Sequence, residues 1–293
     1  MAAITHTSVH VDTEKSGRLT FDVLQSPVPD GPQLIALHGF PQGARAWERT
    51  AAILAERGIG LHAIDQRGYS PGARPDGVEH YGDRTLSNDV LAIADQLGLR
   101  TFHLAGHDWG SHIAWVTAAL HPDRVRTLTA VSIPHPTAFG RAYKESSDQK
   151  QRSGYMKLFW QPGAAENELL GDKAAGLRAT YDDLEAADVE RYVSRLQEPG
   201  ALTAALNWYR AMRTNPTGLP SVTVPTTFVW SDGDRAVSWR SAELCAEYVE
   251  GDYRLVELSG VSHWIPERAP QPLAAAIADR IASVDSPSRQ GAC

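Results

Sequence analysis

Cysteine is scarce in this chain: its 293 residues include only two, Cys245 and Cys293. Two cysteines, one of them the last residue, do not indicate a disulfide framework, so we expect a protein of the reducing cytoplasm. The first residues lack a basic segment followed by an apolar one, which predicts no signal peptide. No apolar run is long enough to span a bilayer, so no membrane segment is expected.

Basic residues are also fewer than acidic ones. The chain has 28 Lys and Arg residues against 35 Asp and Glu residues, which gives a formal net charge of -7. This balance argues for a soluble protein and against nucleic acid or an anionic membrane as a partner. Hydrophobic residues make up 42% of the chain, which is sufficient for a core. The length suggests one large α/β domain or a core with an insertion.

Strand and helix patterns alternate over much of the chain. Polar–apolar alternation at 6–11 and 18–24 predicts an antiparallel hairpin. Apolar runs predict buried strands, and apolar positions on one helical face predict helices. The further strands expected are 34–37, 61–64, 101–105, 125–133, 224–230 and 253–258, and the helices are 44–57, 87–97, 111–120, 240–249 and 273–282. This alternation predicts a mostly parallel sheet with helices on both faces.

The alternation stops in the middle of the chain. Residues 135–219 are rich in helical pattern and in aromatic residues, and they contain no convincing central strand. We therefore predict an α/β core formed by 1–134 and 220–293, with 135–219 inserted as a helical cap. Among the aromatic residues of this insertion, Tyr143, Tyr181 and Tyr192 are assigned to packing or to the surface.

The segment Gly106-His107-Asp108-Trp109-Gly110 lies between an expected strand and an expected helix. Two glycines around a central residue are typical of the nucleophile elbow, a sharp turn that holds its central residue in a strained conformation. Asp108 occupies that position here, and a carboxylate there attacks carbon directly and becomes an ester. The alternative is that Asp108 only caps the following helix.

Two later segments supply partners for this aspartate. Asp232 and Asp234 follow one expected strand and His263 follows the last, so all three belong at the carboxyl edge of the sheet, where α/β sheets place their sites. The order nucleophile, acid, histidine is that of a hydrolase triad. Asp234 is the preferred acid because the turn carries it beyond the strand end, and Asp232 remains the alternative.

Taken together, these motifs resemble the α/β-hydrolase superfamily over nearly the whole chain, and within it the epoxide hydrolases with an aspartate nucleophile. The residues that carry the resemblance are His38-Gly39-Phe40-Pro41, Gly106-His107-Asp108-Trp109-Gly110, Asp234, His263, Tyr155 with Phe159, Pro162-Gly163 with Glu166, and Asn207-Trp208-Tyr209-Arg210. The resemblance implies an α/β-hydrolase fold with a mostly parallel eight-stranded sheet and an inserted cap. Trp160-Gln161 departs from the family pattern, which should alter the shape of the pocket.

The resemblance also implies a reaction. Tyr155 and Tyr209 would point from the cap toward Asp108 and protonate the epoxide oxygen while Asp108 attacks the ring carbon. A water deprotonated by His263, which Asp234 orients, would then hydrolyse the ester. The backbone N–H groups of Phe40 and Trp109 would receive the oxyanion. The partners implied are a small epoxide and water, with no cofactor; His103, His107 and His112 are not spaced as metal ligands.

Three other functions compete with this one. A haloalkane or haloacid dehalogenase also uses an aspartate at the elbow, and Trp109 could bind the halide. Phe40 offers no second halide donor, however, and no arginine follows the nucleophile to bind a haloacid carboxylate. A serine esterase is disfavoured because no serine lies in an elbow. A non-catalytic ligand receptor would leave these reactive groups without a purpose.

Overall fold

The computed structural model describes residues 4–214 and 218–285. Cys293 and residues 215–217 of the expected cap therefore lie outside the described residues. Within the described part, eight strands form one sheet, which confirms the eight-stranded prediction. The strands are β1 (Thr5–Thr13), β2 (Gly17–Ser26), β3 (Gln33–Leu37), β4 (Gly60–Ile64), β5 (Phe102–His107), β6 (Val125–Val131), β7 (Thr226–Ser231) and β8 (Tyr253–Leu258).

The sheet is mostly parallel, and its order is β1-β2-β4-β3-β5-β6-β7-β8. Strands β1 and β2 form the predicted antiparallel hairpin, and β2 is also antiparallel to β4. From β4 to β8 every neighbouring pair is parallel. The central strands β3 to β7 are almost entirely buried, as apolar runs covered on both faces should be. Their carboxyl ends share one edge.

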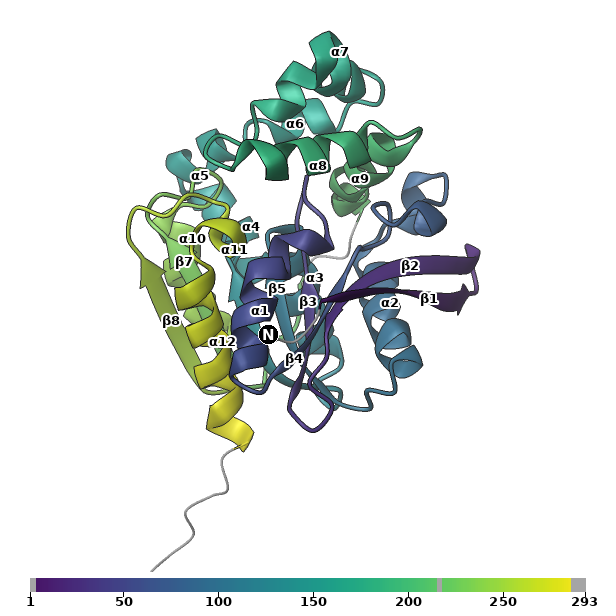
Figure 1. Ribbon diagram of the computed structural model, residues 1–293. Coiled ribbons are helices and arrows are strands. Elements are labelled where there is room, and N and C mark those ends of the chain that lie inside the picture. The colour runs from purple at the N-terminus through teal and green to yellow at the C-terminus, as the bar shows by residue number, and fades with distance from the viewer. Residues whose placement is uncertain (1–3, 215–217, 286–293) are drawn as a thin grey trace, which may run out of the picture.

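Helices cover both faces of the sheet (Figure 1). One face carries α1 (Glu48–Glu56) and α12 (Pro270–Asp285), which pack against each other over a separate apolar core. On the other face, α2 (Asp83–Gln96) and α3 (Trp109–Leu120) pack together in the larger core. The short segments of the core are η1 (Ala44–Trp47), η2 (Pro71–Ala73), η3 (Val78–His80), α10 (Trp239–Glu243), η5 (Leu244–Tyr248) and α11 (Ile265–Arg268).

The described elements between β6 and β7 are all helices, joined by short loops. Its elements are α4 (Pro136–Glu145), α5 (Ser147–Arg152), α6 (Met156–Phe159), α7 (Ala164–Arg178), α8 (Ala186–Leu196), α9 (Ala201–Ala211) and η4 (Met212–Thr214). Helices α6 to α9 lie beyond one edge of the sheet rather than on either face (Figure 1). Apolar residues of α6, α7, α8 and α9 continue the larger core.

Some predicted elements differ in detail. The helix expected at 44–57 begins as η1, where the Ala44 N–H donates to Asp65 Oδ1 at 2.7 Å, before α1 continues it. The helix expected at 240–249 is α10 followed by η5, and it ends at Tyr248 because Val249 pairs with Val222. The strand expected at 125–133 ends at Val131, since Ser132 has a positive φ of 69°. No helix in the described ranges is long and apolar enough to cross a membrane.

Candidate active site

Asp108 occupies a strained turn between β5 and α3. Its φ of 52° and ψ of -122° lie where a residue with a side chain is rarely found. Close packing imposes this turn: a Cβ on Gly106 would lie 2.1 Å from the Gly110 carbonyl oxygen, and one on Gly110 would lie 2.2 Å from that of Leu37. Within the described structure, the Asp108 side chain makes no capping bond to α3, so helix capping does not explain it.

Backbone N–H groups bind the Asp108 carboxylate. The Phe40 N–H donates to Asp108 Oδ1 at 2.8 Å, and the Trp109 N–H also favours the ionised carboxylate by lowering its pKa. The loop that carries Phe40 approaches so closely that a Cβ on Gly39 would lie 2.3 Å from the Asp108 Cβ. The two N–H groups expected to receive an oxyanion are therefore already directed at this carboxyl group.

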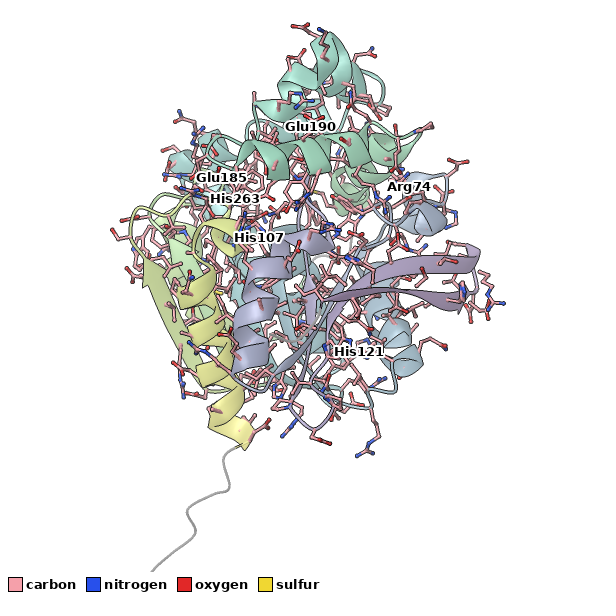
Figure 2. All side chains as sticks on the ribbon, in the orientation of Figure 1. Arg74, His107, His121, Glu185, Glu190 and His263 are labelled. Atoms are coloured by element: carbon pink, nitrogen blue, oxygen red, sulfur yellow. The ribbon has the colours of Figure 1, made fainter. Side chains whose placement is uncertain are left out.

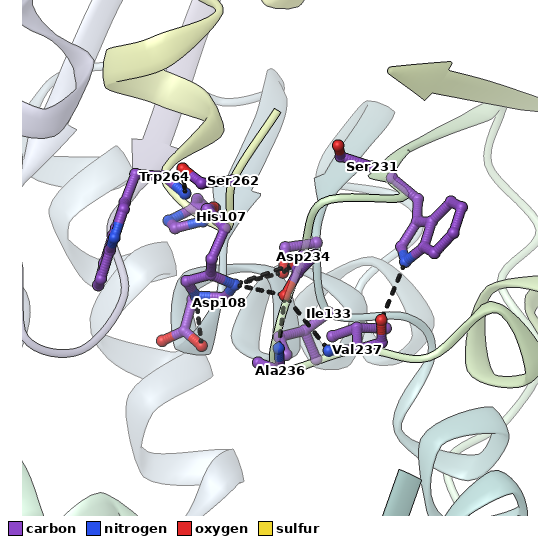
Figure 3. A network of polar contacts seen from close by, with 12 residues as sticks. His107, Asp108, Ile133, Ser231, Asp234, Ala236, Val237, Ser262 and Trp264 are labelled. Atoms are coloured by element: carbon purple, nitrogen blue, oxygen red, sulfur yellow. Dashed lines mark hydrogen bonds and ion pairs between the residues drawn. The ribbon is translucent and has the colours of Figure 1, made fainter. Parts of the chain in front are cut away.

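The imidazole of His263 lies between two carboxylates. Its Nε2 is 3.5 Å from Asp108 Oδ2, and its Nδ1 is 3.0 Å from Asp234 Oδ2. Asp234 is held in turn by the N–H groups of Ala236 and Val237, which donate to Oδ1 at 2.7 and 3.3 Å (Figure 3). Asp108, His263 and Asp234 therefore form one chain of polar contacts, although they follow strands that are far apart in the sequence.

The alternative acid, Asp232, has other partners. Its carboxylate accepts hydrogen bonds from Ser259 Oγ at 3.1 Å and from the Gly260 N–H. These contacts join the turn after β7 to the turn after β8. Asp232 therefore shapes the loops, while Asp234 reaches the imidazole.

The site holds two negative charges around one positive charge. Burial disfavours the imidazolium of His263, but Asp234 and Asp108 outweigh that cost and raise its pKa to about 10. Burial likewise disfavours the ionised forms of Asp108 and Asp234, yet His263 holds the pKa of each carboxyl below its ordinary value. The resting site is therefore a carboxylate, an imidazolium and a second carboxylate.

Tyr155 and Tyr209 share a cavity of about 600 Å³ with Asp108 and Trp109. Tyr155 as a whole residue is 38% exposed although its hydroxyl group is buried, whereas Tyr209 is buried throughout. Burial, together with the nearby Asp108, raises the pKa of both phenols, so both are neutral at physiological pH. Both residues line the cavity. The cavity volume is within the usual range for small-molecule sites.

The sequence motif around Tyr209 fixes the position of its ring. Tyr209 packs edge-on against Trp109 and Phe40, with ring centroids 5.0 and 5.3 Å apart. The guanidinium of Arg210 donates to both carboxylate oxygens of Glu166 at 3.0 Å, which ties α9 to the start of α7. The Gly163 N–H donates to the same carboxylate at 2.8 Å. The motif residues in the insertion thus form a scaffold behind the phenol.

Several polar side chains near the site were not predicted. Ser132 Oγ donates to Asp234 Oδ2 at 2.5 Å and lies 3.0 Å from His263 Nδ1. Its position directly after a buried strand was a usable signal. Tyr181 and Tyr192, which were assigned to packing or to the surface, are buried. The Tyr181 hydroxyl donates to the Pro41 carbonyl oxygen at 2.6 Å, and the Tyr192 hydroxyl donates to Glu267 Oε1 at 2.8 Å.

His107 lies next to His263, as both labels show in Figure 2, and their ring centroids are 4.9 Å apart. Burial and the charge of His263 lower the pKa of His107 to about 4. Across residues 4–214 and 218–285, no group of three or more His, Cys, Asp or Glu side chains is arranged to hold a metal ion.

Comparison with known proteins gives a consistent group of relatives. Residues 32–270 match a family model described as the alpha/beta hydrolase fold. The AB hydrolase superfamily protein YfhM of Bacillus subtilis is 33% identical over 86% of this chain and 91% of its own length. Epoxide hydrolase A of Mycobacterium tuberculosis is 29% identical over 90% and 94%. The crystal structure of a Bacillus megaterium epoxide hydrolase in complex with an inhibitor has a TM-score of 0.84 at 25% identity, covering 94% of this chain and 99% of that one.

Proposed function

Because this chain belongs to the α/β-hydrolase fold family, we propose that it is an epoxide hydrolase that opens an epoxide to a vicinal diol. The observation that carries the proposal is that the Asp108 carboxylate and the neutral phenols of Tyr155 and Tyr209 line the same cavity. A carboxylate can attack a ring carbon, and a phenol can protonate the oxygen that leaves.

In the first half-reaction, Asp108 Oδ2 attacks a ring carbon, since Oδ1 is held by the Phe40 N–H. The carbon–oxygen bond of the ring breaks, and Tyr155 and Tyr209 hydrogen-bond to the released oxygen while one of them gives it a proton. The product is a hydroxyalkyl ester of Asp108. Two observations support this role of Asp108. Its buried carboxyl group is ionised, and the strained turn places it in the lining of the cavity.

In the second half-reaction, His263 Nε2 takes a proton from water, which attacks the Asp108 carbonyl carbon. Esterification has removed the charge of Asp108, so His263 loses one of the two carboxylates that kept it protonated, and its proton restores the tyrosine that protonated the epoxide oxygen before His263 acts as the base. The oxyanion forms on Oδ1 against the Phe40 and Trp109 N–H groups; one such donor is worth roughly 3 kcal/mol of barrier. Collapse breaks the bond from Cγ to Oδ2, and the leaving alkoxide takes the proton that His263 received from water. The new carboxylic acid of Asp108 then protonates His263, which restores the resting site, and the diol carries an oxygen that came from Asp108.

We assign the other features of the chain to this reaction. The helical insertion at 135–219 serves as the cap, supported by its contribution of Tyr155 and Tyr209 to the cavity. The reaction needs only a small epoxide and water, with no cofactor. The buried free thiol of Cys245 supports a cytoplasmic location.

The proposal is tested by offering the purified protein styrene oxide and, separately, a bromoalkane. We expect diol formation from the epoxide and no bromide release. Bromide release without diol would identify a dehalogenase, for which the Trp109 indole could bind the halide. Absence of both products over a broad panel of epoxides and haloalkanes would favour a non-catalytic receptor.

A further inference from the structure

A chain of hydrogen bonds runs behind the catalytic residues from the helical insertion to the backbone of His263. The Tyr192 hydroxyl on α8 donates to Glu267 Oε1 on α11 at 2.8 Å, and Gln42 Nε2 lies 2.6 Å from the same oxygen. Gln42 Oε1 lies 2.9 Å from His107 Nδ1, and His107 Nε2 lies 2.8 Å from the His263 carbonyl oxygen. None of these four side chains has a role in the chemistry proposed above.

Counting donors shows where a proton must lie in this chain. His107 Nε2 faces a carbonyl oxygen, so Nε2 carries a hydrogen and donates it. The His107 ring is buried and neutral at physiological pH, so its Nδ1 can only accept. Nδ1 and Gln42 Oε1 would then be two acceptors in contact. Rotating the Gln42 amide by half a turn exchanges its oxygen and nitrogen, and the NH₂ group then donates to Nδ1.

This rotation turns the Gln42 oxygen toward Glu267. A carboxylate cannot donate to that oxygen, but a neutral carboxylic acid can. The separation of 2.6 Å between the two side chains fits an O–H···O bond better than an N–H···O bond. We propose that Glu267 is a neutral carboxylic acid in the resting protein and that, through Gln42 and His107, it positions the catalytic His263.

The surroundings of Glu267 also favour the neutral form. Its side chain is buried, and among the described residues Oε2 has no hydrogen-bond partner, which would be costly for a charged oxygen. Burial raises the pKa of this carboxyl to about 7. The neutral acid therefore predominates below that pH.

The charged and titratable groups that face Glu267 do not neutralise it. On α8 they are Tyr192, which donates to it, and Asp188, whose charge further disfavours ionisation. Arg49 on α1 is the nearby cation, and it forms an ion pair with Asp188 at 2.7 Å. Tyr181 is a buried neutral phenol that donates elsewhere, and His107 is reached only through Gln42.

Loss of this proton leaves the chain one hydrogen short. Two acceptors then face each other, either between Gln42 and Glu267 or between Gln42 and His107. The contact that fixes the His263 carbonyl therefore loosens. Glu267 is a positioning residue in this scheme, because it touches neither substrate nor the reacting atoms. Activity should therefore decline above about pH 7 for a reason separate from the titration of His263 itself.

The protonation state can be measured without any substrate. In wild-type protein labelled with ¹³C at glutamate carboxyl carbons, we expect one carboxyl resonance to titrate with a midpoint near 7. The Glu267→Gln variant should lack it, whereas Glu250→Gln, at an exposed position, should keep it. Loss of a matching neutral-acid infrared band on raising the pH would agree. Titration of every glutamate at its ordinary pKa would overturn the proposal, even if Glu267→Gln failed to fold.

The positioning role rests on the proposed function and has its own test. Gln at 267 can still donate to the Gln42 oxygen and cannot ionise, so Glu267→Gln should remain active and lose the decline above about pH 7. Glu267→Ala should lower kcat about tenfold without changing KM. Equal losses in both variants, with an unchanged pH profile, would refute positioning. If no epoxide is turned over, only the proposed function fails, and the resonance still decides the charge of Glu267.

Discussion

The Nε2 atom of His263 lies 3.5 Å from Oδ2 of Asp108, the oxygen that we propose attacks the epoxide. The two groups therefore set each other's charge. While Asp108 is a carboxylate it helps keep His263 protonated, and once Asp108 is an ester that support is gone. In the proposed reaction His263 must stay protonated in the first step and act as the base in the second, and the charge of Asp108 would control this change.

Removing the nucleophile should abolish turnover. Asp108→Asn keeps the shape of the side chain, but an amide cannot form the ester, so we expect no diol above background. Asp232→Asn is the matched control, because Asp232 lies after β7 and binds the Ser259 loop rather than the imidazole. It should keep its activity within about threefold, measured as diol formation by chromatography. Full activity in Asp108→Asn would refute the assigned nucleophile.

Removing the base should stop the reaction halfway. His263→Gln leaves Asp108 able to attack but deprives the ester of its activated water, so the covalent adduct should accumulate. Intact-mass spectrometry after addition of an epoxide should show the protein heavier by one substrate, and peptide mapping should locate it on Asp108. An adduct on another peptide would contradict the two-step scheme.

The two half-reactions should respond differently to pH. Adduct formation needs ionised Asp108, whose pKa lies below its ordinary value, so its rate should change little between about pH 6 and pH 9. Ester hydrolysis needs neutral His263, so in the Glu267→Gln background, where the decline above about pH 7 is absent, its rate should rise with pH, with a midpoint below the value of about 10 for the resting enzyme. Single-turnover fluorescence can separate the two rates. Identical pH dependences would count against control of His263 by Asp108.

Removing either phenol should slow ring opening specifically. Tyr209→Phe and Tyr155→Phe each delete one proton donor and leave the ring packing in place, so we expect adduct formation to slow about 100-fold in each. Hydrolysis of an adduct already formed should be nearly unaffected. Tyr143→Phe, which lies outside the cavity lining, serves as the control. If both variants of the cavity phenols opened epoxides at the wild-type rate, the acid would have to be another group.

The close approach behind Asp108 gives a backbone test. Gly39→Ala would place a Cβ 2.3 Å from the Asp108 Cβ and displace either the nucleophile or the Phe40 N–H. We expect kcat to fall by at least about 100-fold, because a misplaced oxyanion donor alone has an effect of this size. Gly171→Ala, where a Cβ would meet nothing within 4 Å, is the control. Steady-state kinetics and a melting curve for each variant separate a catalytic effect from unfolding.

The sheet and most of the core could be predicted because their signals are local. A central strand of this sheet is buried on both faces, so it appears in the sequence as an apolar run, and the run at 34–37 lies within β3 and ends at the same residue in the structure. The elbow was also legible, since only glycine fits where Gly106 and Gly110 approach neighbouring backbone. Local patterns predicted the ends of elements less well. Ser132 ends a strand with a positive φ, and Val249 leaves a helix to pair with Val222, and neither is visible in the local sequence.

The sequence by itself determined which residue types reach the edge of the sheet: a carboxylate at a strained turn, acidic residues after β7, a histidine after β8, and phenols in the insertion. Tertiary structure alone decided that Asp234 rather than Asp232 meets His263, and that Ser132 joins them. It also brought Gln42 to Glu267, which is 225 residues away along the chain. Turn chemistry and apolar periodicity depend on adjacent residues, whereas these polar contacts depend on how distant segments pack.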